Sequence, residues 1–288
     1  MRKHIAYPMT TTQTRGALPP SSLAGVPVRS GGFLATINAE IIKFFTLKTG
    51  PIATAVLGVF IVLAALLSSL SLLSPSGNQN PNAEPITSVT ELRFVDTVLW
   101  MAIVFAVVAV LFATSEFSSG QIQLSFLATP KRVPVVLAKS VVIGMLGFLV
   151  GAIASTLAMF VAFAVLYTSD VTYEIDLPDV ATLATASGLF MGLIGIVSLA
   201  FGLLVKNVII GIAVPVLLFS ILPSILESIG NEVVTTIVGY LPSVAGRVIL
   251  TTFPNPAGLE AWPGMAVLAG WAVVMVALAS IVLRQRDA

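Results

Sequence analysis

Six segments of the sequence are apolar, contain no charged residue, and are each long enough to cross a membrane. They are residues 51–73, 97–114, 140–167, 180–205, 208–226 and 263–283. An α-helix of about 20 apolar residues spans the roughly 30 Å hydrocarbon core of a bilayer. Because lipid offers backbone groups no water, a spanning helix must pair them internally. The sequence therefore predicts an all-α polytopic membrane protein with six transmembrane helices, the third of them long and tilted or protruding.

The composition excludes several other classes of protein. Of the 288 residues, 57% are hydrophobic and 9% are charged, and the mean hydropathy is +1.04, whereas a soluble domain carries about 25% charged residues. A formal net charge of +1 offers no basic footprint for nucleic acid. The absence of cysteine excludes thiolate catalysis and cysteine metal sites.

The charged residues predict the orientation of the six spans, because Lys and Arg are retained on the cytoplasmic side. With both termini inside, 12 of the 14 basic residues are cytoplasmic, and only Arg93 and Arg247 lie outside. Of the 13 acidic residues, 10 are then external, with Glu40, Glu116 and Asp287 as the exceptions. We expect a multi-pass protein of the plasma membrane with both termini in the cytoplasm.

The N-terminal part of the chain divides into a tail and a helix. Residues 1–32 show no apolar period and are interpreted as a flexible cytoplasmic tail, whereas 33–288 forms a single transmembrane domain. Residues 33–48 place apolar side chains at steps of three and four, with Glu40 and Lys43 on another face. This pattern favours an amphipathic helix in the cytoplasmic interface, the alternative being an extension of the first span.

The segment 228–262 is apolar in part but interrupted. Pro242, Gly246, Arg247, Pro254 and Pro256 break its pattern, and a full crossing would place the C-terminal arginines outside. We expect a re-entrant or external helical hairpin before the last span, with its broken backbone buried in protein.

The inventory of reactive side chains predicts no catalysis and no metal or cofactor in this chain. The only histidine is His4, in the tail, so no serine has a histidine base within the spans. The acidic run from Asp170 to Asp179 could hold a cation, but a solvated external loop is the favoured interpretation. No span carries an ionisable group for ion coupling, and no GxxxxGK[ST] loop is present. An ATP-driven machine would need a separate ATPase chain.

The connection between the second and third spans, residues 115–135, carries the most specific signal. A helix is predicted to begin near Gly120, capped by Ser118 or Ser119 and ending at Pro130. Its apolar side needs a surface to bury against and consists of Ile122, Leu124, Phe126 and Leu127. This loop is therefore a plausible docking element for a partner protein.

The order of these elements, with the motif E-F-x-x-G-Q-I…L-A-T-P-K-R between Glu116 and Arg132, resembles the permease subunits of type-2 ATP-binding-cassette (ABC) exporters of the actinobacterial type. The resemblance implies two permease copies, identical or different, two ATPase subunits that bind ATP and Mg²⁺, an interface helix and a cytoplasmic coupling helix. It assigns coupling to the ATPase to the following residues: Glu116, Phe117, Gly120, Gln121, Pro130, Lys131, Arg132, Glu40 and Lys43. The alternative is that these charges only mark the membrane edge.

We expect an export permease that moves a hydrophobic or amphipathic drug, peptide or lipid-like substrate. The alternative is a sensory or immunity component on the same scaffold that transports nothing. Candidate residues along the substrate path are Phe105, Phe112, Phe190, Met191, Phe201 and Phe219, although an aromatic side chain on such helices more often faces core or lipid. Gly188 and Gly192 have the G-x-x-x-G spacing of close helix packing, either within one subunit or between two.

Overall fold

The computed structural model describes residues 32–46, 49–73, 88–118 and 132–285, except for the side chains of 116–118 and 132. Within these ranges the chain is helical and contains no strand; only an isolated bridge joins Ser88 to Thr172. The long helices are α2 (Thr49–Leu73), α4 (Thr97–Ser118), α6 (Arg132–Leu166), α7 (Leu177–Val205) and α12 (Ala261–Gln285), with the composite helix Val208–Ser228 between α7 and α12.

All six of these helices are long and apolar enough to cross a membrane, and each covers one predicted span. The prediction of an all-α polytopic membrane protein is confirmed. The third span is one continuous helix, as expected, but α6 begins at Arg132 rather than at 140. Lys139 therefore lies inside the helix and not before it.

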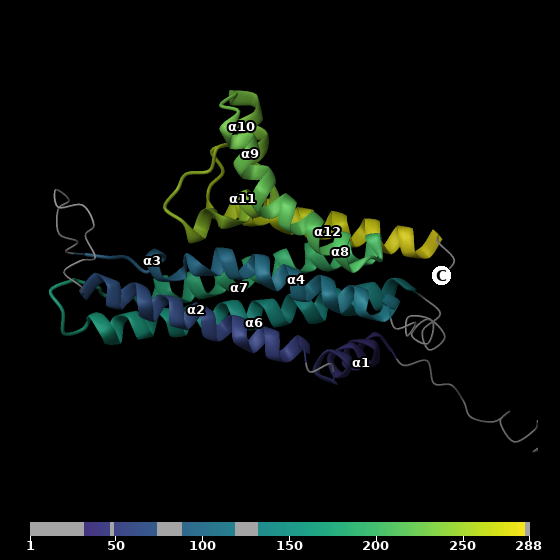
Figure 1. Cartoon of the computed structure of the whole chain (residues 1–288), viewed down its shortest axis with the longest axis horizontal. Coiled ribbons are helices and arrows are strands. Elements are labelled where there is room, and N and C mark those ends of the chain that lie inside the picture. Colours follow the sequence, from purple (N-terminus) through teal and green to yellow (C-terminus); the bar gives the residue numbers. More distant parts are fainter. Residues whose placement is uncertain (1–31, 47–48, 74–87, 119–131, 286–288) are drawn as a thin grey trace, which may run out of the picture. The chain divides into compact units, whose positions relative to one another are not determined.

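The helices α2, α4, α6 and α7 run side by side (Figure 1), and α7 is the most buried of the long helices. One end of this bundle carries Lys43, Lys139, Lys206 and Arg284 and is called the basic end below. The opposite end, called the acidic end, carries Glu91, Asp96 and the loop from Asp170 to Asp176.

Glycines bring α6 and α7 into backbone contact at the centre of the bundle. A Cβ atom on Gly192 would lie 2.6 Å from the carbonyl oxygen of Gly144, and one on Gly188 would lie 2.6 Å from that of Phe148. A Cβ on Gly147 would lie 2.7 Å from the Cα of Gly192. Only glycine allows this approach, so the G-x-x-x-G pair packs within one subunit. This contact, formed by Gly144, Gly147, Gly188 and Gly192, is called the glycine seam.

The N-terminal helix α1 (Phe33–Thr46) packs on α6 at the basic end and buries Glu40 and Phe44. It corresponds to the amphipathic helix that the sequence predicts over 33–48, of which residues 47 and 48 lie outside the described part. The tail 1–32 lies outside it too, apart from Gly32.

The segment 228–262 folds as an interrupted helical pair, as predicted. Helix α10 (Glu232–Gly239) meets α11 (Pro242–Gly246) and the 3₁₀ turn η3 (Arg247–Leu250) at 66°. The side chain of Asn255 donates to the carbonyl of Gly239 over 3.0 Å, and the indole of Trp271 donates to that of Tyr240 over 2.9 Å. The free carbonyls at the break are thus paired within the protein, which the expected hairpin requires.

The composite helix Val208–Ser228 contains a feature that the sequence analysis did not predict. Between α8 (Val208–Val216) and α9 (Leu222–Ser228), the π turn η2 (Leu217–Ile221) replaces regular α-helix. Pro215 and Pro223 flank it and remove two backbone donors, so the hydrogen-bonding register changes between them. Beyond this turn α9 and α10 project from the side of the bundle (Figure 1).

Candidate functional site

A cavity of about 280 Å³ lies in the acidic half of the bundle, beside the π turn. Its walls come from α4, α7, the α8–α9 helix, and α11 with the segment after it. The lining residues are Asp96, Leu99, Trp100, Ala102, Ile103, Phe190, Ile194, Phe219, Ser220, Pro223, Ser224, Glu227, Ser243, Arg247, Thr251 and Phe253. Polar and charged side chains are concentrated here although the spans themselves are uncharged, and we call this space the polar cavity.

The composite helix brings Phe219 and Ser220 into this wall. Phe219 is buried and faces Phe190 and Ile194 of α7 across the cavity. Both residues lie within the π turn, whose wider winding sets their side chains at angles that differ from those of a regular α-helix. Such turns are frequent at functional sites, and this one forms one side of the cavity.

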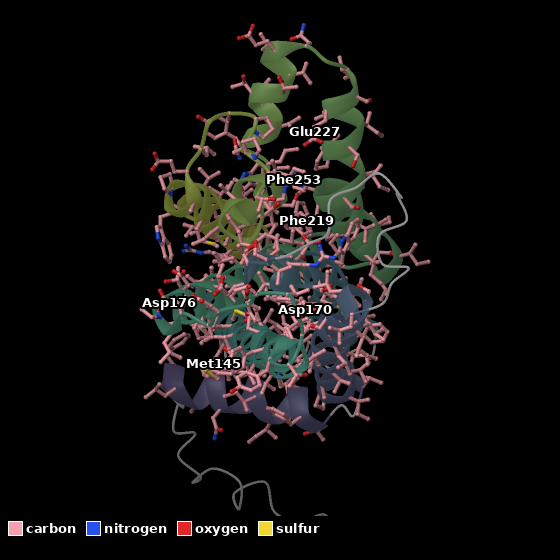
Figure 2. The ribbon with its side chains drawn as sticks, turned by 90° about the vertical axis from the view of Figure 1, so that its left-hand side faces the viewer. Met145, Asp170, Asp176, Phe219, Glu227 and Phe253 are labelled. Carbon is pink, nitrogen blue, oxygen red and sulfur yellow. The ribbon has the colours of Figure 1, made fainter. Side chains whose placement is uncertain are left out.

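An ion pair joins two elements at the edge of the polar cavity. A guanidinium nitrogen of Arg247 lies 3.5 Å from a carboxylate oxygen of Glu227, with both side chains about 40% exposed (39% and 40%). Figure 2, which looks onto the acidic end, shows Phe219, Phe253 and Glu227 on the same side of the bundle, toward the projecting helices. The pair links η3 to α9 in a setting that water reaches.

The hydroxyl of Ser243 in the cavity wall is buried and lacks a hydrogen-bond partner among the described residues. By contrast, the hydroxyl of Ser224 in the same wall donates to the carbonyl of Ser220 over 3.0 Å. An unpaired buried hydroxyl costs about 1–3 kcal/mol, and a polar atom of a bound molecule would remove that cost.

The predicted path residues separate in the structure. Phe190 and Phe219 line the polar cavity, whereas Phe105 and Met191 are fully buried in the core. The ring of Phe105 fills the space beside Gly195, where a Cβ would lie 2.6 Å away. The other two predicted residues, Phe112 and Phe201, lie outside the cavity: Phe112 near the basic end and Phe201 partly buried against the core.

The sequence analysis did not predict the polar residues of the cavity as site residues, because they come from segments far apart in the sequence. Asp96, Glu227, Ser243 and Arg247 belong to four different elements and share no motif. One signal was present: Arg247 is one of only two basic residues that the predicted orientation places outside. A cation that departs from the charge rule requires a local partner, and Glu227 is that partner.

A second charged site lies at the basic end and joins three helices. A carboxylate oxygen of Glu40 on α1 lies 2.7 Å from the ammonium nitrogen of Lys139 on α6. The other oxygen of Glu40 accepts a hydrogen bond from Lys43 over 2.7 Å. The ammonium of Lys139 also lies 4.3 Å from the ring centre of Phe112 on α4, and we call these four residues the buried charge cluster.

The centre of this cluster is almost fully removed from solvent, whereas Lys43 at its edge is partly exposed. The exposed fractions of the side chains of Glu40 and Lys139 are 2% and 1%, and the ring of Phe44 packs edge-on against Phe112, with centroids 5.4 Å apart. Burying two charges is favourable only with close pairing and further contacts, which the second lysine and the aromatic face supply. The cluster therefore holds α1 against the first turns of α6 and the last turns of α4.

Two of the predicted coupling residues, Glu40 and Lys43, belong to this cluster. Glu40 faces inward toward Lys139, and Lys43 lies beside it, partly exposed. Glu116 and Phe117 belong to the last turn of α4, one turn after Phe112, and Arg132 begins α6. The remaining members, Gly120, Gln121, Pro130 and Lys131, and the predicted helix of that loop lie outside the described residues.

The loop between α6 and α7 packs on the acidic end. Tyr173 contacts the ring of Phe94, with centroids 5.1 Å apart. Burial raises the pKa of its phenol, and the nearby Glu91 carboxylate raises that pKa further.

The described residues contain no group of three or more acidic or histidine side chains arranged to hold a metal ion. Asp170 and Asp176 of the acidic run are labelled in Figure 2.

The fold and the two sites describe a multi-pass, all-helical membrane protein with a polar cavity in one half of its bundle and a buried charge cluster at the opposite end. Comparison with known proteins adds no family: no protein-family model matches the chain, and no curated protein matches its sequence.

Proposed function

We propose that this chain is the permease subunit of an ATP-driven exporter. It would work with ATPase subunits and a second permease copy to move a hydrophobic or amphipathic molecule across the plasma membrane. The observation that carries this proposal is the polar cavity, because polar groups within a membrane protein usually mark a substrate or ion pathway. Aromatic walls beside hydroxyls and a partly exposed ion pair suit a ligand with an apolar body and a polar group.

The energy source is proposed to be a partner protein. The sequence contains no phosphate-binding loop and no ionisable residue within its predicted spans, so neither nucleotide hydrolysis nor ion coupling has a clear basis in this chain. The resemblance of residues 116–132 to the coupling segment of type-2 ABC permeases supports an ATPase docked there.

The buried charge cluster supports a path for the mechanical signal. The loop 119–131 connects the end of α4 to the beginning of α6, and the cluster ties both helices to α1. In the proposed mechanism, the basic end faces the cytoplasm and the ATPase moves α1 and the loop together. This motion reaches the polar cavity through α4 and α6 and changes its access.

Purification of the tagged full chain from its native membrane tests the proposal. We expect an ATPase with a GxxxxGK[ST] motif to co-purify, and amphipathic dyes or peptides to stimulate ATP hydrolysis in the reconstituted complex. Ser243→Trp, which fills the cavity, should remove the stimulation but leave basal hydrolysis. Hydrolysis that no substrate affects, with no ATP-dependent movement of substrate, would favour the sensory or immunity alternative. If no ATPase co-purifies, the proposal is wrong.

The proposed orientation has its own test, because the chain has no native cysteine. Single cysteines that replace Ser76, Thr129 and Thr172 are expected to react with a membrane-impermeant maleimide from outside, inside and outside, respectively. A reversal at any of the three positions would overturn the orientation while leaving the six-span fold intact.

A further inference from the structure

An apolar groove runs along the flank of the bundle between α6 and α12, with α7 as its floor. Its volume is about 800 Å³. It extends from Val133 and Ile281 near the basic end to Met145 and Ala269 near the middle of these helices. In Figure 2, Met145 lies on a flank well separated from Glu227 and the projecting helices. This flank groove is therefore distinct from the polar cavity.

The flank groove offers no free side-chain hydroxyl donor to an occupant. The two hydroxyls in its wall are already used, since Ser140 donates to the carbonyl of Val136 over 2.9 Å and Ser280 donates to that of Val276 over 2.7 Å. The other lining residues are apolar. Since the chain is a membrane protein, an apolar groove along two of its spans takes a hydrocarbon chain or another apolar helix.

The length of the flank groove suits one acyl chain. At 1.5 Å per residue, the stretch of α6 from Val133 to Met145 is about 18 Å long. The acyl region of one leaflet is half of the roughly 30 Å hydrocarbon core, or about 15 Å thick. A lipid tail of the leaflet next to the basic end therefore fills this groove along its length.

A positive charge stands where the lipid head group would lie. Arg284 follows Ile281 by three residues and Ser280 by four in the same helix, so it occupies the next turn on the groove face. Its side chain is exposed. A guanidinium at this position can pair with a phosphate through two parallel hydrogen bonds.

A second apolar groove, between α2 and α6, provides a comparison. Its volume is about 580 Å³, and its lining is also apolar apart from one threonine. The residues one turn beyond its ends on α2 are Gly50, Pro51, Ser69 and Leu70, none of them charged. This α2–α6 groove can hold a hydrocarbon chain, but among the described residues of α2 no charged side chain stands at its ends to select a head group.

We infer that the flank groove binds one acyl chain of an anionic glycerophospholipid and that Arg284 holds its phosphate. The occupant comes from the leaflet next to the basic end, and the site selects lipids by charge. This lipid site does not depend on the polar cavity or on transport activity, so its test is separate from the test of the proposed function.

Native mass spectrometry of the purified full chain tests the inference, in micelles with equal amounts of phosphatidylglycerol and phosphatidylcholine. The wild type is expected to retain one lipid, mainly phosphatidylglycerol. Arg284→Gln should reduce this preference about fivefold, the effect of one basic residue near an anionic surface. An unchanged preference would overturn the role of Arg284, and because this side chain is exposed at a helix end, its variant is expected to fold.

A matched pair of tryptophan variants tests the location. Ala277→Trp fills the flank groove and should abolish lipid retention, whereas Ala55→Trp makes the same change in the α2–α6 groove and should preserve it. The reverse result would overturn the site. A second copy of the chain could instead cover the groove: an Ala277→Cys variant that forms disulfide-linked dimers on oxidation would show this and contradict the lipid, whereas one that stays monomeric supports it.

Discussion

The ion pairs Glu40–Lys139 and Glu227–Arg247 both tie a peripheral helical element to the rest of the fold, but in opposite ways. The first joins atoms 2.7 Å apart with side chains 2% and 1% exposed, and the second joins atoms 3.5 Å apart with side chains 40% and 39% exposed. A buried pair is strong only while both members remain, because either one alone is an uncompensated charge. An exposed pair is exchanged for water at little cost.

The two ends of the protein differ in how tightly their helical elements are held together. At the basic end, α1, α4 and α6 are joined to one another by charges and by an edge-to-face contact between two rings. Around the polar cavity, the elements are held by a loose ion pair and an irregular helix, and one hydroxyl in the wall is unpaired. We therefore expect the basic end to be more rigid than the elements around the polar cavity.

The largest expected loss of stability follows from a change in the buried ion pair Glu40–Lys139. Lys139→Met leaves Glu40 with the partly exposed Lys43 as its counter-charge, so we expect a cost below the roughly 3–5 kcal/mol that is typical of breaking an isolated buried pair. We expect a large fall in the thermal midpoint of the purified protein in detergent. The double variant Glu40→Leu with Lys139→Met should recover much of this loss, since replacing both charges with apolar groups is often close to neutral. Equal melting of Lys139→Met and wild type would show that the cluster does not anchor α1.

The glycine seam is the next strongest test of rigidity. In Gly192→Ala, the added Cβ would lie 2.6 Å from the carbonyl oxygen of Gly144, so the two backbones must separate. Overpacking of this kind costs about 1–3 kcal/mol, which would appear as a lower thermal midpoint. Gly270→Ala on α12 is the control, because no atom lies within 4 Å of its added Cβ. If both variants melt alike, the seam is not tightly packed.

A change in the polar cavity is expected to increase the stability of the protein. Ser243→Ala removes the buried unpaired hydroxyl, and we expect the free energy of unfolding to rise by about 1 kcal/mol. If Ser243 binds substrate, the same change lowers the affinity of the exporter for it. Ser198→Ala is the control, because its hydroxyl already donates to the carbonyl of Ile194 over 2.7 Å. A loss of stability in Ser243→Ala would mean that its hydroxyl is paired.

The smallest effect is expected at the exposed pair. Glu227→Gln should change the free energy of unfolding by less than about 1 kcal/mol, since exposed ion pairs contribute little. The small difference should vanish at high salt, where the charges are screened. A loss as large as that of Lys139→Met would abolish the contrast between the two ends.

The span pattern was predictable because its physical cause acts residue by residue. A run such as 180–205 must be a helix in lipid whatever surrounds it, and the structure has α7 over Leu177–Val205. The same holds for the break in the segment 228–262, since a proline cannot lie in the interior of a regular helix and Pro242 begins a new one, α11. Sequence reasoning also gave the close packing of Gly188 and Gly192, but the structure was needed to show that their partner is α6.

The sites were less predictable because they depend on long-range contacts. Lys139 was interpreted as a positive charge at the membrane edge, and its pairing with Glu40 joins residues almost a hundred positions apart. The π turn requires the combined effect of Pro215 and Pro223 on the residues between them, which hydropathy does not register. The polar cavity brings together side chains from several elements, and each of them alone looks like an ordinary loop or helix residue.

The length of α6 has a mechanical consequence. Its 35 residues extend about 52 Å, roughly 20 Å more than the hydrocarbon core that a span must cross. The buried charge cluster contacts α6 near its first turns, and the glycine seam packs it against α7 nearer its centre. α6 is therefore one unbroken helix that connects the place where α1 is anchored to the glycine seam in the middle of the bundle, so a displacement of α1 that moves α6 as a rigid body is expected to reach the seam.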